Sequence, residues 1–126
     1  MTDDRFPPSA VLIPGRWQPL HAGHVALLRR AMEQYETVHV GIFETPTSDR
    51  NPWSVTDRMV MFWGEFAYEL LTGRMRLIVL PWVSGLVYGR DCGWASERIK
   101  LPDAVETGYS GTRERNAACQ TNNPSA

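Results

Sequence analysis

Two histidines three residues apart carry the strongest chemical signal in the sequence. His21 and His24 follow a short apolar run, residues 10–13, and stand where a helix is expected to begin. Residues three apart on a helix are neighbours on one face, and the free N–H groups and dipole at a helix start attract an anion. Gly23 between them leaves room for a phosphate chain. Two imidazoles placed there can donate hydrogen bonds to phosphoryl oxygens and stabilise the charge that develops during transfer.

The histidine pair also has plainer interpretations. A lone histidine in a helix is usually a packed or a surface residue, and we interpret His39, in an expected strand, in that way. Two histidines can also be metal ligands, but no third ligand stands at a plausible spacing. We therefore predict no metal site built from protein ligands.

Alternating apolar segments predict the elements that position this pair. Hydrophobic and β-branched runs predict strands at residues 10–13, 37–43, 77–80, 86–88 and 98–101. Helical spacing of apolar residues predicts helices at about 21–35, from 54 to near 73, and at 110–118. The expected buried residues of the first helix are Val25, Leu28, Met32 and Tyr35. Those of the second are Met59, Phe62, Trp63, Phe66 and Leu70.

The second helix has recognisable start and stop signals. Ser54 can cap its first turn, with Asp57 answering as the third-residue carboxylate of a capping box, and Gly73 supplies the stop. Arg58 lies in the first turn, where a cation is a poor partner for the helix dipole. This misfit hints at an anion nearby, although surface arginines are common.

The order of these elements predicts one α/β domain. We expect a single Rossmann-like three-layer sandwich with a mostly parallel sheet over residues 10–118, a flexible N-terminus at 1–9 and a flexible tail at 119–126. Ligands of such sheets bind beyond the carboxyl ends of the strands. Residues 14–24, at the exit of the first strand, are therefore expected at the centre of the site.

Composition excludes several other classes of protein. The chain has 126 residues, 43% of them hydrophobic, and a net charge of −1 from 13 basic and 14 acidic side chains. This balance gives no general attraction to nucleic acid or to an anionic membrane, and no run is long enough to span a bilayer. Cys92 and Cys119 form no C-x-x-C pattern, and no signal peptide is apparent. We expect a cytoplasmic protein with reduced thiols.

Two later segments carry further candidates for a nucleotide site. Ser110, Gly111 and Thr112 at a helix start offer backbone N–H groups and hydroxyls to a phosphate, and Arg115 one turn on can grip two phosphoryl oxygens. An ordinary helix cap with a surface arginine would look the same. Residues 88–94 form a glycine-containing turn that can approach a nucleotide or be a plain turn.

Three motifs in order resemble one superfamily. Residues 15–24, GRWQPLHAGH, are similar to the G-R-F-Q-P-x-H-x-G-H signature of nucleotidyltransferases with the H-x-G-H motif, with Trp17 in place of phenylalanine. Residues 51–58, NPWSVTDR, are similar to N-P-F-[ST]-x-x-E-R, and residues 109–115, YSGTRER, to [IY]-S-G-T-x-[IV]-R. The form resembles archaeal-type nicotinamide-nucleotide adenylyltransferases and their small phage and bacterial relatives.

The resemblance implies a reaction and a set of site residues. An enzyme of this kind moves a nucleoside monophosphate, here most simply AMP from ATP, onto a small phosphorylated acceptor such as nicotinamide mononucleotide, with Mg²⁺ carried mainly by the triphosphate. The implied catalytic residues are His21, His24, Arg16 and Arg115. The implied nucleotide-binding residues are Gly15, Trp17, Gly23, Gly89, Arg90, Asp91, Ser110, Gly111 and Thr112. The acceptor would meet Asn51, Arg58, Trp82 and Trp94.

Other functions fit the same motifs. Related enzymes transfer a cytidylyl group from CTP to an alcohol-bearing phosphate or an adenylyl group to phosphopantetheine. A non-catalytic nucleotide-binding module is an alternative from a different class, and pyrophosphate release separates it from the enzymes. Members of this superfamily commonly assemble, so a homo-oligomer is possible.

Overall fold

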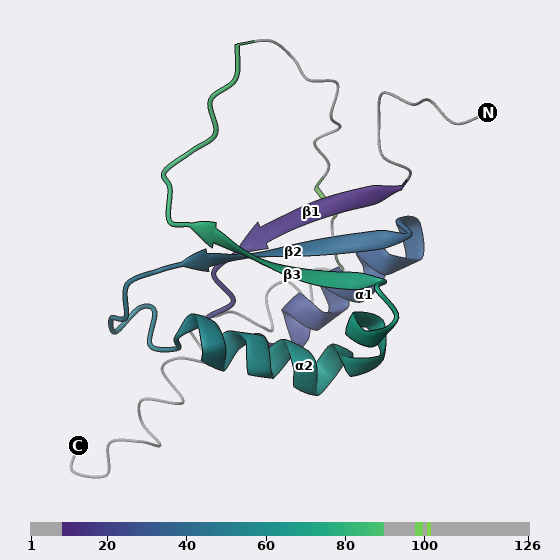
Figure 1. Cartoon of the computed structure of the whole chain (residues 1–126), viewed down its shortest axis with the longest axis horizontal. Coiled ribbons are helices and arrows are strands. Elements are labelled where there is room, and N and C mark those ends of the chain that lie inside the picture. The colour runs from purple at the N-terminus through teal and green to yellow at the C-terminus, as the bar shows by residue number, and fades with distance from the viewer. Residues whose placement is uncertain (1–8, 90–97, 100, 102–126) are drawn as a thin grey trace.

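The computed structural model of the chain describes residues 9–89, 98–99 and 101. Strands and helices alternate along this part of the chain (Figure 1). The elements are β1 (Ala10–Gly15), α1 (Ala22–Gln34), β2 (Thr37–Glu44), α2 (Val55–Leu71) and β3 (Met75–Pro81). The first four expected elements and the strand at 77–80 are thus confirmed, with ends that differ by a few residues.

The three strands form one parallel sheet in the order β1-β2-β3. In the register of the sheet, Val40 of β2 lies between Ile13 of β1 and Leu77 of β3. Parallel neighbours need crossover connections, which α1 and α2 supply. All three arrowheads point to the same end of the sheet in Figure 1, so the carboxyl ends of the strands share one edge.

Both described helices pack on the same face of the sheet. Alternate residues of β2, Val38, Val40 and Ile42, are fully buried, as a strand with period two requires. They join the buried faces of α1 and α2 in one core, whose members are Trp17, Leu28, Ala31, Val38, Val40, Ile42, Phe62, Phe66 and Met75. Figure 1 shows the two helices together on one side of the sheet.

Contacts between the helices explain why they lie side by side. Arg29 of α1 forms ion pairs with Glu65 and Glu69 of α2, at 3.6 and 3.3 Å. Its guanidinium carbon also lies 4.8 Å from the centre of the Phe66 ring. The aliphatic stem of an arginine can cover apolar surface while its charge stays in water. Arg29 therefore covers the outer edge of the core next to Phe66.

The ends of α2 are set by the signals expected from the sequence. Ser54 Oγ accepts a hydrogen bond from the Asp57 amide at 3.1 Å, and Asp57 Oδ2 accepts one from the Ser54 amide at 3.2 Å. This confirms the capping box. Gly73, with φ of 79°, follows the C-cap residue Thr72. That left-handed conformation favours glycine and ends the helix.

The arrangement is an α/β fold of the Rossmann-like type, as expected. The order β-α-β-α-β with a parallel sheet corresponds to one mononucleotide-binding half of such a fold. The described residues contain the sheet and one helical layer of the expected sandwich. No helix in this described part is both long and apolar enough to cross a membrane.

Two expected strands are wrong in the described residues. Residues 86–88 form no strand, and Val87 is 97% exposed. Residues 98, 99 and 101 are not in a strand either. A run of three apolar residues gains stability as a strand only when a neighbouring edge pairs with it, and no described strand pairs with these residues. The expected helix at 110–118 lies outside the described residues.

One expectation about a single residue is wrong. Trp63, expected in the buried face of α2, is 45% exposed, because it sits one position around the helix from Phe62, which takes the core position. Ser9, directly before β1, accepts hydrogen bonds at its carbonyl from the amides of Glu36 and Thr37. These bonds attach the start of β1 to the start of β2.

Candidate functional site

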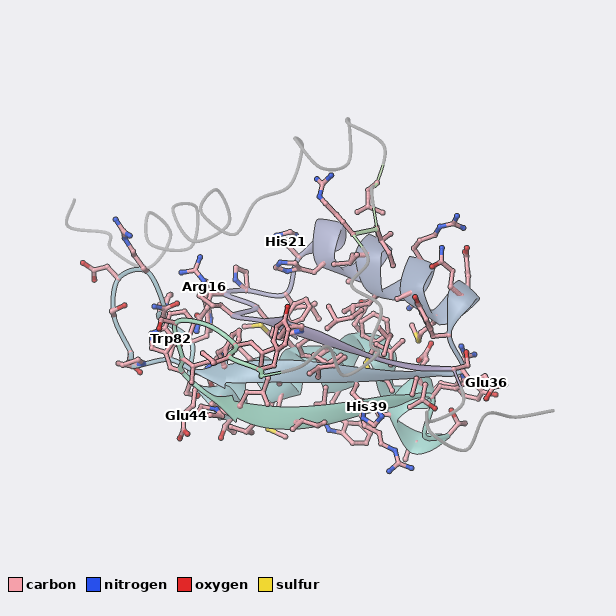
Figure 2. The ribbon with its side chains drawn as sticks, turned by 90° about the horizontal axis from the view of Figure 1, so that it is seen from above. Arg16, His21, Glu36, His39, Glu44 and Trp82 are labelled. Carbon is pink, nitrogen blue, oxygen red and sulfur yellow. The ribbon has the colours of Figure 1, made fainter. Side chains whose placement is uncertain are left out.

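The candidate site lies at the carboxyl ends of the strands, where the fold was expected to place it. Arg16 directly follows β1, and the loop after it leads into α1 at His21. Figure 2 shows Arg16, Glu44 and Trp82 at one end of the sheet, with His21 at the start of α1 and Glu36 at the opposite end. The first-strand exit is therefore the natural centre of a ligand site.

His21 caps α1 with its own side chain. Its Nδ1 accepts hydrogen bonds from the amides of Gly23 and His24, at 3.1 and 3.3 Å. His24 Nδ1 in turn accepts from the His21 amide at 3.4 Å, which completes a reciprocal capping box. The sequence predicts that these helix amides are free for an anion. They are bonded to His21 instead, so an anion here would meet imidazole groups first.

This capping pattern also decides where the imidazole protons lie. A neutral imidazole carries one N–H and one acceptor nitrogen, and the hydrogen bond at one nitrogen determines the state of the other. Because Nδ1 of His21 accepts from two amides, the proton of its neutral ring is on Nε2. Nδ1 of His24 accepts from the His21 amide, and the ring of His24 also donates a hydrogen bond to the Pro19 carbonyl.

The two rings are stacked, and His24 is held neutral. Their centroids lie 3.7 Å apart with planes inclined by 17°. Burial, and then the charge of His21, lower the pKa of His24 from 6.5 to about 4, although a hydrogen bond with the backbone of Pro19 acts in the opposite direction. At neutral pH His24 is therefore uncharged, so a ligand at this ring would meet a neutral imidazole.

The ring of Trp17 packs against the ring of His24. Only 3% of Trp17 is exposed, and its Nε1 donates a hydrogen bond to the Gly41 carbonyl at 3.0 Å. Its ring meets His24 edge-on at 4.9 Å and Phe62 edge-on at 5.3 Å. We had expected Trp17 to contact nucleotide. A buried indole has no face left for a base, so its role in this structure is to pack against His24.

Gly15 is required by this tryptophan. A Cβ atom added at Gly15 would lie 2.9 Å from Trp17 Cε2, closer than real contacts allow. The glycine was expected to permit close approach of a nucleotide. In the structure it is the Trp17 ring that comes close to Gly15. The same ring packs against His24.

Arg58 faces the backbone of the site. It is fully buried, and its Nη1 donates to the carbonyls of Arg16 and Phe43 at 2.7 and 2.8 Å, while its Nε donates to the Ser54 carbonyl at 3.1 Å. Burial lowers the pKa of this guanidinium, although the Asp57 carboxylate opposes the effect. We had expected Arg58 to contact the acceptor. These bonds and its zero exposure give it a structural role, joining the ends of β1 and β2 to the start of α2, while its Nη2 is buried without a hydrogen-bond partner among the described residues.

Gln18 is the residue that sequence reasoning missed. It was part of the first motif but received no role. In the structure it is 2% exposed and bonds to both backbone groups of Trp53. A polar residue between a tryptophan and a proline in a strand-exit loop was the available signal, because a buried amide must find hydrogen-bond partners.

Four of the remaining expected residues lie in the described part of the chain, and the others lie outside it. Arg16, Trp82 and Gly89 are exposed, and Trp82 packs edge-on against Phe43 at 5.3 Å between ring centres. Asn51 is partly buried and bonds to Ser48, at the loop between β2 and α2. The other expected residues lie outside the described part of the chain: Arg90, Asp91, Trp94, Ser110, Gly111, Thr112 and Arg115.

The described residues hold no cluster suited to bind a metal. Among residues 9–89, 98–99 and 101, no group of three or more histidine, cysteine, aspartate or glutamate side chains comes together in that way. His39, the third histidine, lies within β2 (Figure 2), on the face opposite to that of Val38 and Val40.

Comparison with known proteins finds a family model that matches the part of the chain carrying this site. Residues 12–63 match the family model described as cytidylyltransferase-like. This segment carries most of β1, all of α1 and β2 and the first half of α2, so it includes the whole capped histidine pair. The resemblance to nucleotidyltransferases is thereby confirmed for this part of the chain.

Two curated proteins that the chain is similar to are both nicotinamide-nucleotide adenylyltransferases. The chain is 34% identical over 76 residues to a nicotinamide-nucleotide adenylyltransferase of Thermococcus onnurineus, an alignment covering 59% of this chain and 41% of that protein. It is 35% identical over 52 residues to nicotinamide-nucleotide adenylyltransferase 1 of Sulfolobus acidocaldarius, covering 40% of this chain and 30% of that protein. The matches therefore span less than half the length of these two relatives.

Proposed function

We propose that the protein is a nucleotidyltransferase that transfers AMP from ATP to the phosphate of nicotinamide mononucleotide, with release of pyrophosphate. The observation that carries the proposal is the stacked pair His21–His24 at the start of α1, with Nδ1 of each ring accepting a hydrogen bond from the backbone. The names of the two relatives favour ATP and nicotinamide mononucleotide as substrates.

The proposed reaction is one in-line displacement. An oxygen of the acceptor phosphate attacks the α-phosphorus of ATP, a new P–O–P bond forms, and the bond to the β-phosphate breaks so that pyrophosphate leaves. Such transfers depend on positioning and on electrostatic stabilisation more than on covalent catalysis. A phosphate nucleophile is already ionised at neutral pH, so the protein need not supply a general base.

The described residues would serve this reaction as donors and supports. His24 would donate from its neutral imidazole to the α-phosphate, and His21 would donate to the same chain of phosphates. Because His24 carries no charge at neutral pH, it would bind phosphoryl oxygens without an ammonium-like ion pair. Exposed Arg16 would supply the positive charge on the reacting phosphates or the acceptor.

Residues outside the described part complete the proposal. Ser110, Thr112 and Arg115 would hold the β- and γ-phosphates. Mg²⁺ would be carried mainly by the triphosphate and water, because Mg²⁺ in such sites commonly keeps several waters. We also propose that the reaction takes place in the cytoplasm and that the protein assembles as a homo-oligomer.

A substrate screen tests the proposal. Purified protein is incubated with ATP, CTP, GTP or UTP together with nicotinamide mononucleotide, phosphopantetheine, glycerol phosphate or ribose phosphate, and pyrophosphate release is followed. Release with ATP and nicotinamide mononucleotide is the expected result. Release with CTP alone would replace the proposed substrate, and nucleotide binding without release from any pair would leave a non-catalytic nucleotide-binding module as the function.

A further inference from the structure

Gln18 joins the loop after β1 to the loop after β2. Its Nε2 donates to the Trp53 carbonyl at 2.8 Å, and its Oε1 accepts from the Trp53 amide at 2.9 Å. A longer contact runs from Nε2 to Thr45 Oγ1 at 3.4 Å. The side chain thus pairs with Trp53 as a neighbouring strand would, although 35 residues separate the two in sequence.

The bonding of Gln18 fixes the distance between the two loops. A buried amide that uses both its donor and its acceptor on one backbone unit has little freedom to move without leaving polar groups unpaired. Arg58 makes a second connection close by, because its Nη1 donates hydrogen bonds to the carbonyls of both Arg16 and Phe43. The loop that carries Arg16 and the segment 51–53 are therefore held as one unit.

The segment that Gln18 holds has one polar group still unpaired. Asn51 Oδ1 is buried and has no hydrogen-bond partner among the described residues. Buried acceptors in native structures are normally bonded, so segment 51–53 would gain from an N–H donor. The nucleotide, in contrast, is assigned to the start of α1, which His21 caps without help from this segment.

We propose that Gln18 is a positioning residue that holds segment 51–53 against the β1–α1 loop and thereby sets the acceptor side of the site. The inference rests on the proposed function and extends it. Gln18 touches no substrate in this account, and it acts through the backbone of Trp53. Its loss is therefore expected to weaken acceptor binding more than binding of the nucleoside triphosphate.

Two variants of Gln18 and one control separate these effects. Gln18→Glu keeps the shape and the acceptor for the Trp53 amide, but puts an oxygen where Nε2 faces the Trp53 carbonyl. Gln18→Met keeps the volume and removes both bonds. The control is Gln34→Glu, the same glutamine-to-glutamate change at an exposed position at the end of α1, away from the site. Each is made in the 126-residue chain.

The first measurement needs no activity. Hydrogen exchange of the Trp53 amide is followed by NMR, because this amide is protected by Gln18 Oε1. We expect exchange in Gln18→Met at least tenfold faster than in the unmodified protein, and unchanged exchange in Gln34→Glu. Unchanged exchange in a folded Gln18→Met variant would overturn the proposal.

The second measurement compares the two substrates. For both Gln18 variants we expect the KM for the acceptor to rise about tenfold or more, the size of effect expected from losing a buried hydrogen bond, while the Kd for ATP stays within about twofold. Equal losses for the two substrates would show a general structural role and overturn the proposal. If the unmodified protein released no pyrophosphate with any pair, the proposed function would fall, whereas amide exchange would still decide whether Gln18 holds the segment.

Discussion

The imidazole rings of His21 and His24 stack at 3.7 Å, with each Nδ1 bonded to the backbone at the start of α1. This relationship makes the helix cap and the candidate catalytic pair the same pair of residues. The backbone thus fixes the orientation of both rings before any ligand arrives. Preorganised donors lose no further order when charge develops on a phosphate.

The lowered pKa of His24 predicts how stability depends on pH. The folded-state pKa of about 4 lies below the ordinary value of 6.5, so the contribution to stability is complete above pH 6.5 and is lost as pH falls through 4. The difference corresponds to about 3 kcal/mol of unfolding free energy. Urea unfolding between pH 7 and 4 should show this loss, and His24→Gln should remove that share of it.

An NMR titration checks the same claim without unfolding. The ring resonances of His24 should shift with a midpoint near pH 4. Titration of His24 at pH 6 to 7 would show that the ring is neither buried nor coupled to His21 as described.

Gly15→Ala should destabilise the protein and disturb His24. The added Cβ would press on the Trp17 ring, which cannot retreat because it is buried and bonded to the Gly41 carbonyl. Overpacking of this kind costs about 1–3 kcal/mol, measurable by thermal or urea unfolding. Gly64→Ala in α2 is the control, since its Cβ meets nothing within 4 Å and alanine is the better helix former. A Gly15→Ala variant as stable as Gly64→Ala would contradict the packing of Trp17 described above.

Arg58→Met should lower the free energy of unfolding by about 3 kcal/mol, because the carbonyls of Arg16 and Phe43 lose a buried charged donor. Urea unfolding measures the loss. Arg50→Met, at an exposed position of the preceding loop, should change stability by less than about 0.5 kcal/mol. Similar values for the two variants would mean that the Arg58 bonds do not hold the ends of the strands together.

The sequence predicted the elements that have strong periodicity. The residues of α1 and β2 repeat with clear spacing, and the capping signals of Ser54 and Asp57 are local, so neither depends on distant parts of the chain. The run at 86–88 has the same composition as a strand, but a strand also needs a partner, and pairing is a property of the whole sheet. Residue types alone therefore could not exclude this strand.

The motif located the site but not the direction of each side chain. Trp17 and Arg58 stand in segments that match nucleotide-binding motifs, and both turn inward, to the Gly41 carbonyl and to the carbonyls of Arg16 and Phe43. Gln18 likewise finds its partner 35 residues away. Such partners are brought together only by the fold, so a motif can show that a residue matters without showing what it contacts.

We propose that the neutral imidazole of His24 stabilises transfer of AMP to a phosphate. The most direct test is the rate of pyrophosphate release from ATP and nicotinamide mononucleotide by the unmodified protein and by His24→Ala, with unfolding curves to show that both are folded. We predict turnover in the unmodified protein and a decrease of about a hundredfold or more in the variant, as loss of one preorganised donor causes. An active protein whose turnover number is the same in His24→Ala would contradict the account.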